Sequence, residues 1–288
     1  MPLLSMKRVL AVARQGGWAV AAFNPVDYAS MKAIIQAAAE AEAPVIVQTS
    51  AKTVKYYGHE AIVGWARELA GAVSVPVSLH LDHGKDLKLL ERCIETGWTD
   101  VMIDASDKPF IENLTLTKQV LEKAARRDVG VEAEVGEIGG VEEDIVADHG
   151  RHADAAQALE FCREAPGLAV FAPAIGTAHG VYKSEPSIEW DVLTQINAGT
   201  PLPFALHGGT GLPDVIIQRA IRLGCSKVNI STNLKHVFID SFVEHHQRHP
   251  EEYEPLKVLE AQYAAMKELV LEKIRQFGGA GRAAEVKA

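Results

Sequence analysis

The sequence predicts an α/β fold, a single (β/α)8 TIM barrel, from three observations. Short β-rich runs alternate with longer helical patterns along the chain, the pattern of a parallel sheet. Eight such runs can be counted, and most are apolar at nearly every central residue, as in strands covered on both faces. The length of 288 residues is one that such a barrel fills as one domain. We therefore expect one domain over residues 1–288 with an extra C-terminal helix.

The expected strands are Val20–Asn24, Val45–Ser50, Val75–His83, Asp100–Ser106, Val129–Glu134, Leu168–Gly176, Pro203–His207 and Lys227–Ser231. Between them lie amphipathic stretches with apolar residues at helical spacing, such as Tyr28–Ala43 and Leu114–Arg127. A doubly wound open sheet is the alternative. That fold would be expected to carry a glycine-rich dinucleotide turn after an early strand, and none of the first three strand ends has one.

Two segments break the regular alternation. Residues 135–152 form an acidic, glycine-containing stretch after the fifth strand, and long loops on this side of a barrel are often lids. We expect a mobile active-site loop there. Residues 250–277 place Leu256, Leu259, Tyr263, Met266 and Val270 at helical spacing, which predicts a helical extension packed on the barrel or on another subunit.

Composition excludes several classes of partner. The formal net charge is −9, and Lys and Arg are scattered among acids, which argues against nucleic-acid binding. The apolar start of the chain is too short and interrupted for a membrane span and lacks a cleavage site, so we expect a cytoplasmic protein. Cys93, Cys162 and Cys225 lie far apart, and we expect buried free thiols.

Polar residues stand at almost every strand end, the position where such barrels carry catalytic groups. His83, His179 and His207 follow the third, sixth and seventh strands and would converge over the barrel mouth. A single such histidine is more often a hydrogen-bonded core residue, but three neutral imidazoles make a catalytic zinc site with open positions. The sequence therefore predicts a Zn2+ centre.

Carboxylates accompany these histidines. Asp104 and Glu134 end neighbouring strands and could bind a metal in a second position or orient the histidines from the outer shell. His80 shares a strand face with Asp82, opposite His83, and we expect it to support the site without being a ligand.

The last two strands end in a pattern typical of phosphate binding. One runs into Gly208-Gly209-Thr210, and the other into Asn229-Ile230-Ser231-Thr232. In these barrels, loops seven and eight bind phosphate through backbone N–H groups and helix N-termini.

In sequence, the chain resembles the class II, metal-dependent ketose-bisphosphate aldolases, the family that holds fructose- and tagatose-bisphosphate aldolases. The resemblance spans nearly the whole chain. It rests on Ala22-Phe23-Asn24, Leu79–Gly84, Val101–Ser106, Val131–Glu134, Gly139–Asp144, Ile175–Gly180 and Leu206–Gly211, in this order.

The resemblance implies roles for individual residues. His83, His179 and His207 would be the zinc ligands, Asp82 the general acid/base, and Glu142 the residue that handles the proton at the carbon of the enediolate. It also implies a monovalent cation, Na+ or K+, beside Gly180. The remaining substrate contacts would come from Asn24, Ser50, Gly208, Gly209, Thr210, Asn229, Ile230, Ser231 and Thr232.

The implied reaction is the reversible cleavage of a ketose bisphosphate, such as fructose or tagatose 1,6-bisphosphate, to dihydroxyacetone phosphate and an aldehyde such as glyceraldehyde 3-phosphate. A Schiff-base aldolase would need a desolvated lysine inside the barrel. Lys227 starts its expected strand and Lys52 lies beyond another, so no strand end provides one.

Departures from the family pattern concern the substrate. Fructose-specific members tend to carry Asp where this chain has Ser231, and tagatose-type members carry a small residue there. Lys52 and Asn233 also differ, and both are candidates for setting specificity, with Lys52 able to contact a distal phosphate or carboxylate. Another phosphorylated ketose or a keto-acid is therefore an alternative substrate.

Two functions of other classes stay open. A zinc hydrolase would use Asp82 to activate a metal-bound water. A non-catalytic supporting subunit of a tagatose-type aldolase need not keep the metal and base residues, and here they are all present. The resemblance implies a homodimer or homotetramer.

Overall fold

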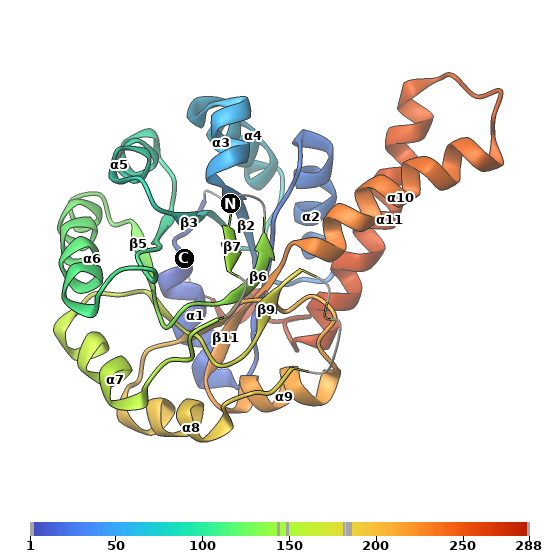
Figure 1. Cartoon of the computed structure of the whole chain (residues 1–288). Helices are drawn as coiled ribbons and strands as arrows, with labels where there is room; N and C mark the ends of the chain where they lie inside the picture. Colours follow the sequence, from blue (N-terminus) through green and yellow to red (C-terminus); the bar gives the residue numbers. More distant parts are fainter. Residues whose placement is uncertain (1–2, 143–144, 148–149, 181, 183–185, 287–288) are drawn as a thin grey trace.

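The computed structural model describes residues 3–142, 145–147, 150–180, 182 and 186–286, and within 141–149 it describes the backbone only. The fold is the predicted barrel: eight parallel strands close in the order β1-β11-β10-β8-β5-β4-β3-β2, with helices around them (Figure 1). The barrel strands are β1 (Val20–Phe23), β2 (Val45–Ser50), β3 (Val77–Gly84), β4 (Asp100–Ile103), β5 (Gly130–Val135), β8 (Val170–Pro173), β10 (Phe204–Leu206) and β11 (Cys225–Ile230).

Amphipathic helices cover the outside of the barrel, as the helical spacing predicts. They are α2 (Tyr28–Glu40), α3 (Ala51–Tyr57), α4 (His59–Gly71), α5 (Leu87–Thr96), α6 (Phe110–Ala125), α7 (Ala155–Glu164), α8 (Trp190–Gly199), α9 (Asp214–Arg222), α10 (Thr232–Arg248) and α11 (Pro255–Gln276). Half of these described helices begin at a side-chain cap: Asp27, for example, accepts a hydrogen bond from Ser30 N in a capping box. None of the described helices has the length and apolar character needed to cross a membrane.

An additional helix, α1 (Met6–Gly16), closes the N-terminal end of the barrel. Leu4 N donates to the carbonyl of Val77 and Met6 N to the carboxylate of Asp100, the first residues of β3 and β4. Met6 and Leu10 then pack against inward-facing apolar residues of the strands. The interior at this end of the barrel is therefore mainly apolar.

Helices α10 and α11 form a hairpin that projects from the barrel (Figure 1). The later half of α11 packs on α2, and Met266 and Val270 are fully buried there. In contrast, Leu256 is 65% exposed at the start of α11, and Phe242 of α10 is 49% exposed. The expected C-terminal helix is thus present from residue 255, but its apolar stripe is only partly covered.

The described part of the segment 135–152 contains two short strands. They are β6 (Gly139–Glu142) and β7 (Ile145–Ala147), and Glu137 bridges to Arg151. β6 also pairs with β9 (Ala178–His179), so a small three-stranded sheet stands over the barrel mouth. Residues 143–144 and 148–149 lie outside the described part of the chain. The expected mobility stays a prediction.

Candidate metal centre and active site

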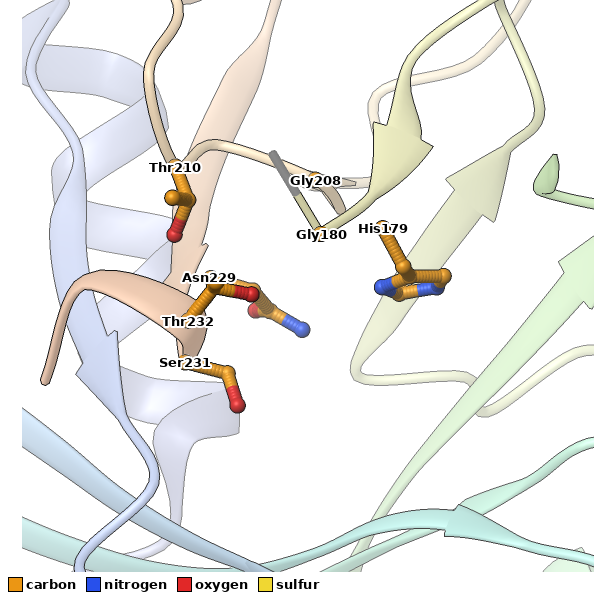
Figure 2. Close-up of a pocket in the computed structure, with 7 residues that line it drawn as sticks. All are labelled: His179, Gly180, Gly208, Thr210, Asn229, Ser231 and Thr232. Atoms are coloured by element: carbon orange, nitrogen blue, oxygen red, sulfur yellow. The ribbon is translucent and has the colours of Figure 1, made fainter. Parts of the chain in front are cut away.

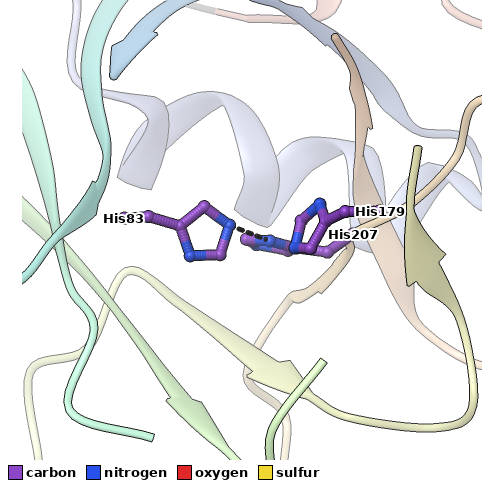
Figure 3. A group of neighbouring side chains, drawn as sticks. All are labelled: His83, His179 and His207. Carbon is purple, nitrogen blue, oxygen red and sulfur yellow. Dashed lines mark hydrogen bonds between the residues drawn. The ribbon is translucent and has the colours of Figure 1, made fainter. Parts of the chain in front are cut away.

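Three histidines from distant parts of the chain meet at the barrel mouth (Figure 3). His83 lies near the end of β3, His179 at the end of β9, and His207 directly after β10. One ring nitrogen of each lies within 4.8 Å of the others, and all three side chains are buried. The arrangement agrees with the convergence that the sequence predicts, although His179 belongs to β9 and not to the sixth barrel strand.

Two of the rings are each oriented by a carboxylate. His83 Nδ1 lies 3.0 Å from Asp104 Oδ2, and His207 Nε2 lies 2.7 Å from Glu132 Oε1. The opposite nitrogens, His83 Nε2 and His207 Nδ1, face one another at 2.9 Å. An imidazole whose one N–H is held by a carboxylate presents the lone pair of its other nitrogen, which is how metal-binding histidines are arranged. The donor set therefore fits a divalent metal ion.

A local distortion of β3 brings His83 into the mouth. Ordinary alternation would place it on the face opposite Asp82. Instead, the pairing of β3 with β4 shifts register between Leu81 and Gly84, and His83 takes φ +47°. Left-handed backbone at a non-glycine residue costs about 1–3 kcal/mol and is concentrated at functional sites. The irregularity lets two consecutive side chains, Asp82 and His83, point into the same site.

Asp82 is buried and held by amide groups from β2, from β11 and from the residue that follows β1. Asn24 Nδ2 and Gln48 Nε2 each donate to Asp82 Oδ2 at 3.0 Å, and Asn229 Nδ2 lies 3.4 Å from Oδ1. Gln48 also donates to Asn24 Oδ1 at 2.9 Å. Three neutral donors therefore fix the orientation of the carboxylate. Sequence reasoning missed Gln48, although its alternation with Ser50 on β2 places it on the inward face.

Glu134 lies in the same buried region. Its Oε1 accepts a hydrogen bond from Ile138 N at 3.2 Å. Burial, with the nearby Asp104 carboxylate, raises the pKa of Glu134 to about 8. Although burial alone would lower it, Asp82 and the hydrogen bond to Asp104 raise the pKa of His83 to about 10. A bound divalent cation would replace this proton, because only the neutral ring is a ligand.

A pocket beside His179 joins the metal centre to the expected phosphate loops (Figure 2). It is lined by His179, Gly180, Gly208, Thr210, Asn229, Ser231 and Thr232. Helix α10 begins at Thr232, so its N-terminus faces the pocket and favours an anion. Gly208 has φ +65°, and a Cβ there would lie 2.3 Å from the carbonyl oxygen of Ala178. Only glycine allows this loop to approach β9 so closely.

The remaining residues of the two loops differ in what they can contribute. Ile230 is fully buried in the outer core, and Gly209 is also buried, so only their backbones are available to a ligand. Tyr182, which sequence reasoning missed, connects β9 to the first of these loops: its hydroxyl accepts from Ala178 N at 2.9 Å and donates to Gly208 O at 2.8 Å. Gly208 is 26 residues away in sequence, so nothing in the spacing indicated this contact.

Other predicted site residues are not brought into the metal centre. Ser50 caps α3 by accepting from Thr53 N at 3.3 Å, and Lys52 is exposed on that helix. Asn233 N lies 3.5 Å from the Thr210 hydroxyl, behind the phosphate loop. The backbone of Glu142 ends β6, and its side chain lies outside the described part of the structure.

One expectation about lysines is wrong. Lys227 is the third residue of β11, and its side chain is completely buried inside the barrel. The strand begins at Cys225, two residues earlier than the sequence suggested, so Lys227 lies within it. Lys227 shares the inward face with Asn229, which is two residues further along the strand. Its ammonium group lies 3.0 Å from Glu132 Oε2 and is therefore engaged in an ion pair. The three cysteines are buried free thiols, as expected.

These groups together can support a defined set of chemical steps. Three imidazoles can hold a metal with open positions, a buried carboxylate can accept a proton beside it, and a glycine-rich pocket can hold an anion. A metal-assisted C–C bond cleavage that leaves negative charge on oxygen, on a substrate that carries a phosphate, can use all three.

Comparison with known proteins agrees with this arrangement. The family model described as "Fructose-bisphosphate aldolase class-II" matches residues 4–282. A fructose-bisphosphate aldolase of Geobacillus stearothermophilus is 40% identical over 99% of this chain and 100% of its own length. A probable fructose-bisphosphate aldolase of Bacillus subtilis is 39% identical over 98% of this chain and 100% of its own.

Solved structures give the same result. The YdjI aldolase from Escherichia coli K12 superposes with a TM-score of 0.86 at 32% identity, covering 98% of this chain and 99% of that one. A putative fructose-1,6-bisphosphate aldolase from Coccidioides immitis gives 0.87 at 25% identity, covering 96% and 97%. The fold, the histidine cluster and these full-length matches lead to one conclusion: the chain belongs to the class II fructose-bisphosphate aldolase family of metal-dependent lyases.

Proposed function

We propose that this chain is a zinc-dependent aldolase that reversibly cleaves a ketose bisphosphate, of the fructose or tagatose 1,6-bisphosphate type, to dihydroxyacetone phosphate and glyceraldehyde 3-phosphate. One observation carries the proposal: His179 belongs both to the histidine cluster and to the anion pocket. A substrate with its phosphate in the pocket therefore has its nearest carbons beside the three rings. The names of the relatives support the same substrate class.

Zinc is the metal that this donor set favours, because three neutral imidazoles and an open position are typical of its catalytic sites. His83, His179 and His207 would hold it, and when bound it would act as a Lewis acid that stabilises negative charge on substrate oxygens. Asp104 and Glu132 keep two of the rings turned toward one point.

Asp82 is proposed as the base for the hydroxyl proton at C4. It is adjacent in sequence to a ligand, is buried, and is fixed by Asn24 and Gln48, so its lone pairs have a defined direction. As the C3–C4 bond breaks, the electrons of the O–H bond form the aldehyde carbonyl and those of the C–C bond remain on the ketone half. Glu142, in its protonated form, is proposed to donate a proton to that carbon. Proton exchange with solvent then removes the proton from Asp82 and restores it to Glu142.

The ketone-side phosphate would lie against Gly208–Thr210 and the start of α10, where backbone N–H groups and the helix dipole favour an anion. A monovalent cation, Na+ or K+, beside Gly180 would offset the phosphate charge. Ser231 lines this pocket, and its small side chain supports a site that accepts more than one stereochemistry at C4.

The distal half of the ketose is proposed to occupy a second cavity of about 220 Å3 beside Asn24. Lys235 and Thr53 line it together with Phe238, so a cation and a hydroxyl group border the cavity proposed for the distal anionic group. Lys52 and Asn233 remain proposed specificity residues, and Lys52 lies one position from Thr53 on α3.

A homo-oligomer, dimer or tetramer, is proposed because the α10–α11 hairpin leaves Ile239, Phe242 and Leu256 about half or more exposed. An apolar surface of this kind on a projecting arm is typical of a subunit interface. The reaction also suits a cytoplasmic enzyme of carbohydrate metabolism.

A coupled assay for dihydroxyacetone phosphate tests the function. The purified chain is given fructose and tagatose 1,6-bisphosphate and a phosphorylated keto-acid, with zinc and after chelation. We expect release of dihydroxyacetone phosphate with zinc only, and no trapped adduct with borohydride. Activity that survives complete metal removal would contradict the proposal, phosphate release without an aldehyde would favour a hydrolase, and inactivity of the zinc-loaded chain would favour a supporting subunit.

A further inference from the structure

A buried polar cluster lies below the metal centre, inside the barrel. Its centre is Glu132 of β5, whose side chain is completely buried. Three basic side chains from other strands surround this carboxylate: His207 Nε2 at 2.7 Å from Oε1, Lys227 Nζ at 3.0 Å from Oε2, and His80 Nε2 at 3.4 Å from Oε2. All of these side chains are equally inaccessible to solvent.

The two oxygens of Glu132 have different partners, and this division has a consequence. Lys227 and His80 both lie against Oε2, so Oε1 is left to His207 alone. With Oε1 bound to the Nε2 proton, His207 must present Nδ1 at the mouth. His83 is arranged in the opposite way, since Asp104 holds its Nδ1 and Nε2 faces the same point.

Lys227 stabilises the buried carboxylate of Glu132. A lone carboxylate without solvent contact would cost several kcal/mol, and a closely placed ammonium group offsets that cost. The Glu132–Lys227 pair links β5 to β11 across the barrel interior. Glu132, which holds His207, is thereby connected to the strand that carries Asn229.

We propose that Glu132, held by Lys227, is a positioning residue that fixes His207 with Nδ1 toward the metal. His80 completes the cluster by its contact with Oε2. The proposal rests on His207 being a metal ligand. It assigns no contact with substrate to Glu132 or Lys227, so their effect acts through metal binding and ligand geometry.

Two variants separate positioning from simple folding. Glu132→Gln keeps the shape of the side chain and an acceptor oxygen, and we expect about a 10-fold loss of zinc affinity. The double variant Glu132→Leu/Lys227→Met removes both charges, so no unpaired charge stays buried. We expect the double variant to fold and its zinc affinity to fall by about 100-fold. Ser78→Ala is the matched control, because Ser78 is buried on β3 two residues before His80 and should leave zinc affinity unchanged.

The readouts are the zinc dissociation constant, by competition with a fluorescent chelator, and the absorption spectrum of the cobalt-substituted protein, which reports ligand geometry. We expect both to change in the two variants with little change in far-UV circular dichroism. Zinc affinity and cobalt spectrum that match the wild type in the double variant would overturn the proposal.

A measurement on the unmodified protein applies even if the variants fail to fold. In zinc-loaded protein with 15N-labelled histidine, we expect His207 to be bound through Nδ1 and protonated at Nε2. Binding through Nε2 would overturn the proposal. His207→Ala tests the metal site separately from the positioning role. Unchanged zinc affinity in His207→Ala would reject the metal site itself. Lost zinc affinity in His207→Ala, together with normal zinc affinity in the Glu132 variants, would reject only the positioning role.

Discussion

The two ends of the barrel interior differ sharply in chemistry. At the N-terminal end, Met6 and Leu10 of α1 pack with Val20 and Ile46 in a closed apolar core. At the mouth, the inward positions of the same strands carry acids, amides and histidines that satisfy one another. The difference indicates that stability comes mainly from one end and chemistry from the other. Substitutions at the two ends should therefore have separable effects.

The largest effect is expected at the mouth. Asp82→Asn keeps the size of the side chain but removes the proposed base, so kcat should fall by about 10²- to 10⁴-fold. Zinc affinity and melting temperature should stay close to the wild type. Steady-state kinetics and a chelator competition test this, with the exposed Asp128→Asn as control. A fall in kcat of less than about tenfold would argue against Asp82 as the base.

The opposite result is expected at the closed end. Leu10→Ala removes a fully buried side chain, and the cavity should lower the free energy of unfolding by about 2–5 kcal/mol. Because the mouth is unaffected, kcat per folded molecule should not change. Urea unfolding and active-site titration measure the two quantities. If kcat fell in parallel with stability, the two ends would be coupled and the comparison would fail.

Asp100 gives the closed end its own pH dependence. Its carboxylate accepts from Ser5 Oγ and Met6 N, but burial raises its pKa from 3.8 to about 6. The folded state therefore holds this proton more tightly than the unfolded state, and the contribution of Asp100 to stability decreases as pH rises from about 4 to above 6. A neutral residue in its place has no such decrease.

Relative to the wild type, Asp100→Asn should thus gain up to about 3 kcal/mol in free energy of unfolding between pH 4 and pH 7. Urea titrations of the metal-free protein at several pH values measure the difference, in which the other titrating groups cancel. A stability difference that stays constant with pH would show that Asp100 ionises normally.

The smallest effect concerns the phosphate pocket. Tyr182→Phe removes the hydroxyl that connects Ala178 N to Gly208 O, at a cost of about 1 kcal/mol in loop positioning. We expect KM for the ketose bisphosphate to rise about fivefold with kcat within twofold of the wild type. Tyr263→Phe removes a hydroxyl on the outside of the barrel and is the control. Equal KM values in both variants would contradict the role of Tyr182.

Much of the fold and part of the site could be predicted from the sequence. Apolar strand runs identified the barrel because strands covered on both faces must be apolar, and strand ends identified the three histidines. Residues at the end of a strand can be recognised from the residues next to them in the sequence. Family resemblance added the reaction.

The parts that sequence reasoning missed depend on contacts between strands. Glu132 stands two residues before Glu134, and alternation alone could have placed it inward. Its partners Lys227 and His207, however, come much later in the chain. The number of residues between two positions does not show whether their side chains meet inside the barrel. The same holds for Gln48 and for the β6–β7 hairpin beside His179. The pairing of β6 with β9 depends on tertiary contacts.

The irregular turn of β3 at His83 has a consequence for motion. Asp82 and His83 are joined by one peptide bond, so their Cα atoms stay about 3.8 Å apart during any fluctuation of the barrel. A base and a metal ligand on separate strands would drift relative to each other with every fluctuation of the sheet. Here the covalent link keeps the proposed base close to one of the proposed metal ligands.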